Sequence, residues 1–377
     1  MQAVHTRMGR RLGPALAALA ALAAVVVLAV TATAAACGGG GSGSSSESES
    51  SSDRGSAAAE PGADEGAFPV TIEHKYGETT IEAAPERVVT VGLTDHDPVL
   101  ALGVAPVGVT DWFGDQPYAV WPWAQDELGD AEPEIVGDVD GIGFEKIAAL
   151  QPDLILAVYA GLTEDDYDTL RQIAPTVAQP GEYVDWGVPW DEQTLIVGRA
   201  LGRSTEAEAA VAAVEDRFTA ARRDHPELEG ATGLVATPYA DTISVYAADD
   251  VRGRFLAALG FVQPPEIAEL AGDGFSADLS PERVDLLDVD ALVWIIGSAE
   301  TDVPRFDDEP LYAGLAVHRD RHDLFVENLD ELGGATSFVS VLSLPFLIDE
   351  MVPRLAAAVA GEAGPSIPAV ASDSASG

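Results

Sequence analysis

The chain of 377 residues is 47% hydrophobic and carries a formal net charge of −43 at pH 7. This charge argues against nucleic acid as a partner, because contacts to phosphates need Lys and Arg, and against electrostatic docking onto anionic lipid. Cys37 is the single cysteine, so the chain has no internal disulfide and its folded body has no thiol nucleophile.

Residues 1–36 have the features of a signal peptide. Three Arg residues between positions 7 and 11 precede an uncharged apolar run at 15–30 and then a stretch of small residues, which is the order typical of a secretory leader. The apolar run is also near the length of an uncleaved membrane anchor.

Cys37 directly follows three Ala residues, and this sequence resembles the bacterial lipobox, in which the cysteine thiol is lipidated. Ala34 departs from the large aliphatic residue preferred at that place. We predict lipidation of Cys37 and a location on the outer face of the cell membrane.

Composition divides the rest of the chain. Residues 37–66 hold the lipidated Cys and a tether rich in Gly, Ser and Glu, and residues 361–377 form a similar tail. Both are predicted to be disordered, because such segments bury too little apolar surface to fold. Between them we predict an N-terminal lobe at 67–203, a bridging helix at 204–226, and a C-terminal lobe at 227–360 that ends in a helix.

Apolar runs alternate with helical patterns in both lobes. This alternation predicts a mainly parallel sheet covered by helices in each. The expected strands are 88–91, 104–109 and 154–158 in the first lobe, and 233–236, 243–246, 291–296 and 324–326 in the second.

One long helix is expected between the lobes. Residues 205–208 have a capping-box signature, and Pro226 ends the pattern. Its length spans roughly 30 Å, so it would make a stiff connection, although a surface helix of one lobe has the same periodicity. The apolar residues at helical spacing are Ala207, Val211, Val214, Phe218 and Ala221.

A repeated phrase supports two similar lobes. Residues 143–156 and 280–293 align without a gap, with Glu145 on Glu282. Each copy is predicted to be a short amphipathic helix that runs into a buried strand. Ligands favour the crevice between such lobes.

Aromatic residues are frequent where strands are expected to end. In open α/β sheets ligands bind beyond the carboxyl ends of the strands, and aromatic faces suit a flat or bulky ligand. A core role is the alternative for several of them, and it is the prediction for Trp294. The ligand-binding candidates are Trp112, Tyr118, Trp123, Tyr159, Trp186 and Tyr239.

The phrases at 85–89, 145–155 and 343–346, with the leader and tether, resemble the iron-siderophore substrate-binding proteins of ABC importers. That group also includes vitamin B12 and haem binders. The resemblance implies an α/β fold of two Rossmann-like lobes joined by a single long helix, with the ligand in the inter-lobe cleft. It also implies a monomer without a cofactor, whose partners are a ferric siderophore and an ABC permease. In that family a Glu on each lobe docks onto permease arginines, and those positions match Glu145 and Glu282.

The same family commonly supplies Arg to its cleft for anionic ferric chelates. Basic residues are scarce here, and Arg252 is the first candidate, with Arg254 as the alternative and Arg305 as a further one in a loop after the strand at 291–296. The first lobe has no Arg in its candidate loops. A neutral ligand, or one bound mainly by aromatic residues, is therefore an open alternative.

Haem or cobalamin binding on the same fold remains an alternative, and a secreted metal-dependent hydrolase is the alternative from a different class. We predict neither an enzyme nor a resident metal, because the sequence has no nucleophile elbow and no convincing metal cluster. Asp95, His96 and Asp97 could face the cleft, but a helix N-terminus explains the two acids. His318 and His322 have ligand-like spacing within a polar, solvated segment.

Overall fold

The computed structural model describes residues 63–64, 66–239, 242–272 and 274–362, without the side chain of Tyr239. Contacts divide the chain into two units, Met1–Ala58 and Ala59–Gly377, and the described residues belong to the second. The predicted leader, the lipidation site Cys37, most of the tether and the tail beyond residue 362 lie outside the described residues.

The first lobe contains a six-stranded sheet in the order β6-β5-β4-β3-β7-β8. All neighbouring strands are parallel except β6, which is antiparallel to β5. A hairpin of β1 (Val70–His74) and β2 (Gly77–Ile81) precedes the sheet. The sheet strands are β3 (Val88–Thr90), β4 (Gly108–Thr110), β5 (Glu134–Asp138), β6 (Gly141–Ile142), β7 (Leu154–Ala157) and β8 (Thr176–Ala178), and the helices are α1 (His96–Ala101), α2 (Gln125–Leu128), α3 (Phe144–Leu150), α4 (Glu164–Leu170) and α5 (Trp190–Leu201).

The second lobe contains a five-stranded sheet in the order β11-β10-β9-β12-β13. Here β9, β12 and β13 are parallel, but β10 and β11 are antiparallel to their neighbours. The prediction of a mainly parallel sheet is therefore wrong for this half, because neighbouring strands separated by only two residues in the sequence, such as β9 and β10, can pair only antiparallel. The strands are β9 (Gly233–Tyr239), β10 (Thr242–Tyr246), β11 (Ser276–Leu279), β12 (Ala291–Ile296) and β13 (Asp323–Glu327).

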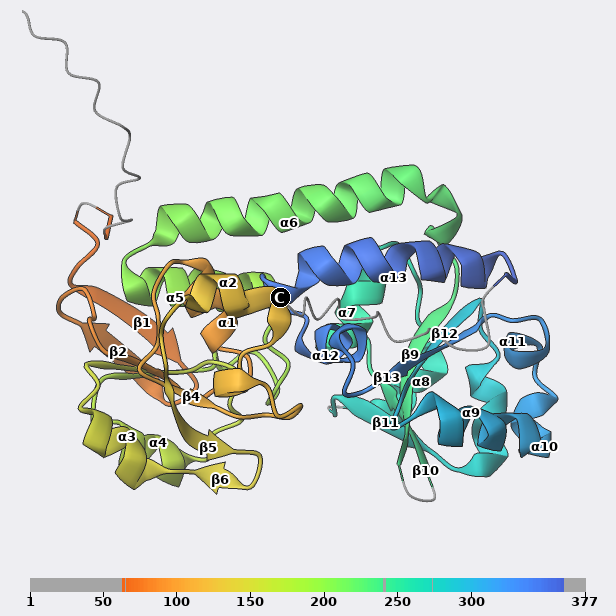
Figure 1. Ribbon diagram of the computed structural model, residues 1–377, viewed down its shortest axis with the longest axis horizontal. Helices are drawn as coiled ribbons and strands as arrows, with labels where there is room; N and C mark the ends of the chain where they lie inside the picture. Colours follow the sequence, from red (N-terminus) through yellow and green to blue (C-terminus); the bar gives the residue numbers. More distant parts are fainter. Residues whose placement is uncertain (1–62, 65, 240–241, 273, 363–377) are drawn as a thin grey trace, which may run out of the picture. The chain divides into compact units, whose positions relative to one another are not determined.

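Helices cover this second sheet and complete the lobe (Figure 1). Among the described residues, 3₁₀ turns at Pro117–Ala119 and Pro122–Ala124 belong to the first lobe, and those at Pro226–Leu228 and Pro281–Leu287 follow α6 and β11. The helices are α7 (Val251–Ala258), α8 (Pro265–Ala271), α9 (Ala299–Asp308), α10 (Pro310–Ala313), α11 (Ala316–Arg319), α12 (Glu331–Phe338) and α13 (Ser343–Val359).

The bridging helix is α6, Ser204–Asp224. In Figure 1 it runs along both lobes, next to α13, and Arg217 of α6 pairs with Asp349 of α13 at 3.1 Å. All five apolar residues predicted to share one face are buried. The predicted capping box is wrong, since the helix begins at Ser204 and its N-cap, Arg203, makes no side-chain cap bond.

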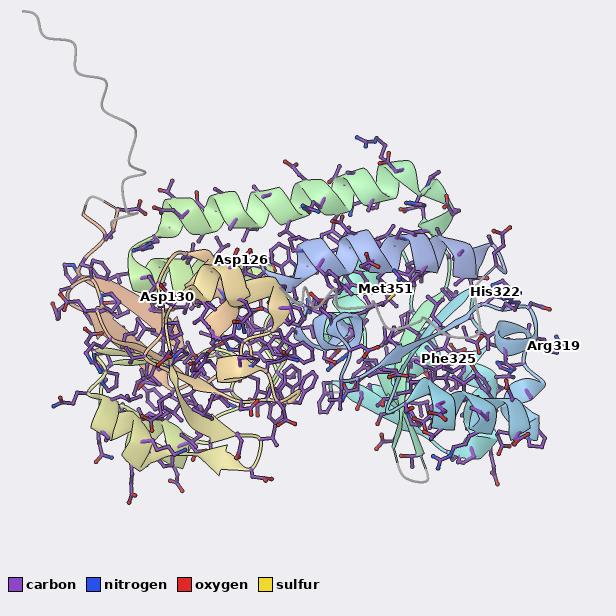
Figure 2. All side chains as sticks on the ribbon, viewed as in Figure 1. Asp126, Asp130, Arg319, His322, Phe325 and Met351 are labelled. Atoms are coloured by element: carbon purple, nitrogen blue, oxygen red, sulfur yellow. The ribbon has the colours of Figure 1, made fainter. Side chains whose placement is uncertain are left out.

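One hydrophobic core runs through both lobes. A single cluster of buried residues contains Leu156 of the first sheet, Phe218 of α6, Val293 of the second sheet and Met351 of α13. Figure 2 shows Met351 beside the second sheet, whereas Phe325 belongs to a separate cluster within the second lobe. Because the lobes share buried apolar surface, moving one against the other would expose part of that core.

Aromatic packing also joins the lobes. Phe338 of α12 lies 5.2 Å from Trp112 and 6.0 Å from Trp121 between ring centroids, and both tryptophans belong to the first lobe. Gly334, one turn earlier in α12, is so close to Trp121 that an added Cβ would lie 2.5 Å from the indole ring. Since Trp121 is fully buried, a glycine is required at this crossing point.

The two copies of the repeated phrase occupy matching places. Residues 143–156 form α3 and β7, and residues 280–293 form a 3₁₀ helix and β12. The second copy is therefore not the α-helix that we predicted: its backbone is kinked at Arg283.

The aspartate shared by the two copies has the same role in each lobe. Asp153 accepts the backbone N–H groups of Glu86 and Arg87, just before β3. Asp290 accepts the N–H and the hydroxyl of Thr232, just before β9. Each carboxylate thus fixes the start of the central strand beside it, which explains why the phrase recurs.

Among the described residues no single helix is long and apolar enough to cross a membrane. Taken together, α12 and α13 have sufficient length and apolar composition, but the chain bends by 114° between them. The apolar side chains of both helices are largely buried in the core.

Candidate functional site

A cavity of about 320 Å³ lies between the lobes. The first lobe contributes Leu93, Trp112, Tyr159 and Trp186, and the second contributes Tyr246, Asp250, Arg252 and Phe275. The walls are mostly aromatic, with one ion pair.

The sheet topology explains where this cavity lies. Leu93, Trp112 and Tyr159 each follow the carboxyl end of a parallel strand, respectively β3, β4 and β7. Carboxyl ends of parallel strands meet at one edge of a sheet, where open α/β folds bind ligands. The second lobe supplies Tyr246 from the end of β10 and Arg252 from the first turn of α7.

A second cavity of about 260 Å³ adjoins the first, because Leu93 and Trp186 line both. Its remaining lining comes from the first lobe and includes Asp138, Asp140 and Asp166. We refer to the two cavities together as the cleft.

Trp186 and Phe275 mark the mouth of the cleft. Their ring centroids are 6.2 Å apart in an edge-to-face arrangement, and the residues are 37% and 43% exposed. The backbone of Trp186 is in the left-handed region, with φ 60°. A non-glycine residue held there is strained, and such strain is found most often at binding and active sites.

Arg252 is held in a fixed position deep in the cleft. Its Nη1 donates to both carboxylate oxygens of Asp250 at 3.0 Å, and its guanidinium carbon lies 3.9 Å from the centre of the Tyr246 ring. Burial acts to lower the pKa of Arg252, but Asp250 and the two nearby tyrosines outweigh it, so the pKa is raised and the group stays charged.

The buried Nε of Arg252 makes no hydrogen bond to any described residue, and Arg252 is only 7% exposed. An unsatisfied buried donor is costly, so a ligand oxygen that accepted this N–H would remove an unfavourable contribution. The carboxylate of Asp250 also accepts the backbone N–H of Arg252 at 2.9 Å and so caps α7.

The fully buried Asp95 fixes Tyr159 from behind. Its two oxygens accept the backbone N–H groups of Val158 at 2.8 Å and Tyr159 at 3.0 Å, and the amide of Gln193 at 2.7 Å. Burial raises the pKa of Asp95 to about 6, against the opposing effect of these donors. Asp95 does not face the cleft, and its role is to hold the loop that carries Tyr159.

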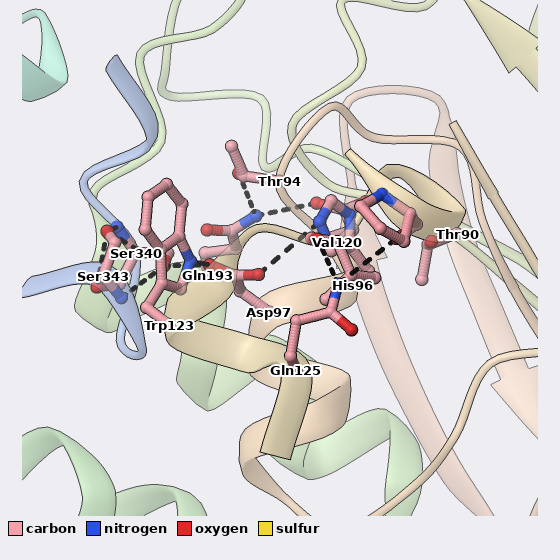
Figure 3. A network of polar contacts seen from close by, with 12 residues as sticks. Thr90, Thr94, His96, Asp97, Val120, Trp123, Gln125, Gln193, Ser340 and Ser343 are labelled. Carbon is pink, nitrogen blue, oxygen red and sulfur yellow. Dashed lines mark hydrogen bonds and ion pairs between the residues drawn. The ribbon is translucent and has the colours of Figure 1, made fainter. Parts of the chain in front are cut away.

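Asp97 links the two lobes through a polar network (Figure 3). Its Oδ2 accepts Nε1 of Trp123 at 2.9 Å and the hydroxyl of Ser340, which precedes α13. His96 lies beside Asp97, with 3.5 Å between His96 Nε2 and Asp97 Oδ1, and is fully buried. Burial lowers the pKa of His96 and raises that of Asp97. Both side chains belong to the lobe interface and neither lines the cleft.

The structure brings together four of the eight predicted ligand-binding residues: Trp112, Tyr159, Trp186 and Arg252. Trp123 instead stacks on Trp121, with 5.1 Å between ring centroids. Tyr118 lies in a 3₁₀ turn at the surface. Arg305 is not in a loop but in α9, where it is 79% exposed and pairs with Asp302. Tyr239 lies in β9, and its side chain is outside the described residues.

Sequence reasoning missed Asp250 as the partner of Arg252 and did not select Tyr246 or Phe275. An Asp two residues before an Arg at the start of a helix is an N-cap signal, and it could have identified the pair. Arg254, the alternative to Arg252, pairs with the exposed Asp249 at 3.3 Å and does not line the cleft.

Glu145 and Glu282 both lie in the first turn of their segments, α3 and the 3₁₀ helix after β11. Both are exposed, and within the described part of the chain neither has a hydrogen bond or an ion pair through its side chain. They line neither cavity.

Within the described ranges no group of three or more His, Cys, Asp or Glu side chains could hold a metal ion. His318 and His322 do not form a shared site, because their side chains have different partners. His318 Nδ1 bonds Asp323 at 2.7 Å, whereas His322 Nδ1 bonds the carbonyl of Ala358 at 2.6 Å.

The chain belongs to the periplasmic binding protein family, whose model matches residues 88–322. Its relatives are substrate-binding proteins, so the prediction of a binding protein rather than an enzyme is confirmed. The two-lobed α/β fold predicted from the resemblance is likewise confirmed.

Among similar curated proteins is the Fe(3+)-citrate-binding protein YfmC of Bacillus subtilis, 25% identical over 65% of this chain and 74% of that protein. The probable siderophore-binding lipoprotein YfiY of the same species is 28% identical over 61% of this chain and 70% of that protein.

Solved structures show the same fold. A periplasmic solute binding protein from Mycobacterium smegmatis has 38% identity and a TM-score of 0.68, covering 77% of this chain and 98% of its own. PiaA of Streptococcus pneumoniae in complex with ferrichrome has 26% identity and a TM-score of 0.70, covering 77% and 99%.

The proposed role of Asp95, which is to hold the loop that carries Tyr159, can be tested by substitution. Asp95→Ala should lower the free energy of unfolding by about 3 kcal/mol or more, because buried N–H donors lose their acceptor. Asp153→Ala is the matched control: Asp153 also accepts two backbone N–H groups but is exposed, so water can replace it and the loss should be about 1 kcal/mol.

Urea unfolding measures both variants, and its pH dependence gives a second readout. The pKa of Asp95 is raised from 3.8 to about 6 in the folded protein, so the folded state binds this proton more tightly than the unfolded state. The stability that protonation of Asp95 contributes is therefore lost as pH rises from about 4 to about 6. Asp95→Ala should lack this slope, and equal losses in the two variants would contradict the assigned role.

Proposed function

We propose that this protein captures a ferric siderophore outside the cytoplasm and delivers it to the permease of an ABC importer. The observation that carries the proposal is the cleft between two lobes, lined by aromatic faces from both and holding one buried arginine. Support comes from the family and from relatives named for ferric citrate and siderophore binding, and from a similar structure in complex with ferrichrome.

The binding step can be tested by fluorescence. Trp112 and Trp186 line the cleft, so titrating the full-length protein in detergent with ferric siderophores should quench part of its tryptophan emission. The iron-free siderophores are the control, and they should quench less. A flat titration with every ferric siderophore class, together with saturable binding of haem or cobalamin, would overturn the siderophore assignment in favour of those ligands.

Delivery is proposed to use Glu145 and Glu282. Support comes from their equivalent positions in the two copies of the repeat, from their exposure and from the absence of side-chain partners in the described part of the chain. Two free carboxylates, one on each lobe, suit paired contacts to cationic side chains of a permease.

The double variant Glu145→Ala/Glu282→Ala should bind the chelate with unchanged affinity but support little iron uptake by cells that depend on this protein. The control is Glu208→Ala/Glu215→Ala, which removes the same charge from two exposed positions of α6 and should leave uptake unchanged. Wild-type uptake by a folded Glu145→Ala/Glu282→Ala protein would refute the docking role.

We further propose that the protein is a monomer anchored by lipidated Cys37, with residues 38–66 as a tether. Cys37→Ser should release the protein from the membrane fraction or leave it with an unprocessed leader. Membrane fractionation and intact mass spectrometry measure both outcomes. A variant that stays bound at the mass of the lipidated wild type would show that the anchor lies elsewhere.

A further inference from the structure

The cleft has an unusual balance of charge. Among the described residues that line its two cavities, Arg252 is the one cation, whereas Asp138, Asp140, Asp166 and Asp250 are acids. The single positive charge is already paired, because Nη1 of Arg252 donates to both oxygens of Asp250 at 3.0 Å. Arg252 and Asp250 together thus contribute little net charge to a ligand.

The other three carboxylates have no cationic partner within the described part of the chain. Asp138 accepts the backbone N–H groups of Asp140 and Gly141 at 2.9 and 3.2 Å. Asp166 accepts the N–H and hydroxyl of Thr163 in a capping box. The side chain of Asp140 makes no hydrogen bond to any residue that the structure describes. The first-lobe wall of the cleft therefore carries uncompensated negative charge.

Asp111, which precedes Trp112, also experiences this negative charge. The pKa of Asp111 is raised, first by burial and then by repulsion from Asp115 and Asp138. Cations could have offset that repulsion, but only His96 acts in the opposite direction, and the lowered pKa of His96 favours its neutral form.

The cleft offers a ligand apolar contact and one N–H donor that suits an uncharged acceptor. Aromatic side chains from both lobes supply the contact area, and the buried Nε of Arg252 has no partner among the described residues. An amide or hydroxamate oxygen can accept from that N–H without bringing an uncompensated charge into contact with Asp250.

We infer that this cleft selects ferric chelates without net negative charge, such as neutral or cationic trihydroxamates, and discriminates against polycarboxylate and tris-catecholate chelates. The inference rests on the proposed siderophore-binding function and specifies its substrate class. In a ferric trihydroxamate, singly charged donor groups neutralise the iron, whereas catecholates or citrate carboxylates leave the complex anionic. Like charges across an interface oppose binding, so the cleft rejects the anionic classes.

The test is a set of titrations of the full-length protein in detergent with ferrichrome, which is neutral, ferrioxamine B, which has the same donor groups and an added ammonium, and ferric citrate, which is anionic. Both trihydroxamates should bind about tenfold more tightly than ferric citrate or better. Added salt should weaken ferrioxamine B binding and leave ferrichrome binding nearly unchanged, because screening acts on the charged ligand.

Asp250→Asn is the decisive variant. Asn keeps an oxygen that can cap α7 but releases the charge of Arg252, so affinity for ferric citrate relative to ferrichrome should rise by roughly tenfold. Asp249→Asn is the matched control, since it removes the same charge one residue away at a side chain that is 84% exposed and outside the cleft. Its affinity ratio should equal that of the wild type. Thermal melting confirms that both variants are folded.

The outcomes separate the two levels of the proposal. Tight ferric citrate binding by the wild type, with an unchanged ratio in Asp250→Asn, would overturn the charge selection and leave the siderophore function standing. Failure of all three chelates to bind would overturn the proposed function and the inference with it. Preference for the trihydroxamates together with the shifted ratio in Asp250→Asn would support both.

Discussion

The burial of second-lobe side chains against the first lobe is the constraint on which the rest of the structure depends. Phe338 packs among Trp112 and Trp121, and Ser340 donates to the buried Asp97. Beside these contacts, one cluster of buried apolar side chains from both sheets, α6 and α13 runs through the two lobes. Apolar area removed from water contributes roughly 25 cal/mol per Å², so opening this interface is costly. The two walls of the cleft are consequently held at a defined separation before a ligand arrives.

Within that frame, the cleft residues are fixed by partners outside the cavity. Asp95 holds the loop of Tyr159 through backbone bonds, and Asp250 with Tyr246 holds Arg252. A ligand therefore meets side chains whose conformational entropy has already been lost, and this preorganisation favours affinity. The exception is the mouth, where Trp186 and Phe275 are partly exposed.

The fold was largely predictable because its signals are local. The apolar runs that form β3, β7 and β12 and the periodicity of α6 depend on a few consecutive residues. The antiparallel pairing of β10 was missed because strand direction depends on the length of the connection and on which strand becomes the neighbour, and periodicity does not report direction.

The site was predictable only in part. Residues directly after strand ends, such as Trp112 and Tyr159, follow from a topological rule. Trp123 is also an aromatic residue in the segment that follows β4. Its stacking on Trp121 and its hydrogen bond to Asp97 nevertheless place it against the core and not in the cleft. The neutralisation of Arg252 by Asp250 depends on side-chain geometry around one helix start, which no count of charges in the sequence can supply.

Gly334 has a consequence for altering this protein. It contributes no atom to the cleft, but its absent side chain allows α12 to approach Trp121, and glycine inside a helix is otherwise unfavourable by about 1 kcal/mol. The approach of α12 to the first lobe thus depends on a residue that does not line the cleft. A methyl group introduced there would fit only if α12 or Trp121 moved, so it would change the shape of the cleft while every lining side chain stays the same.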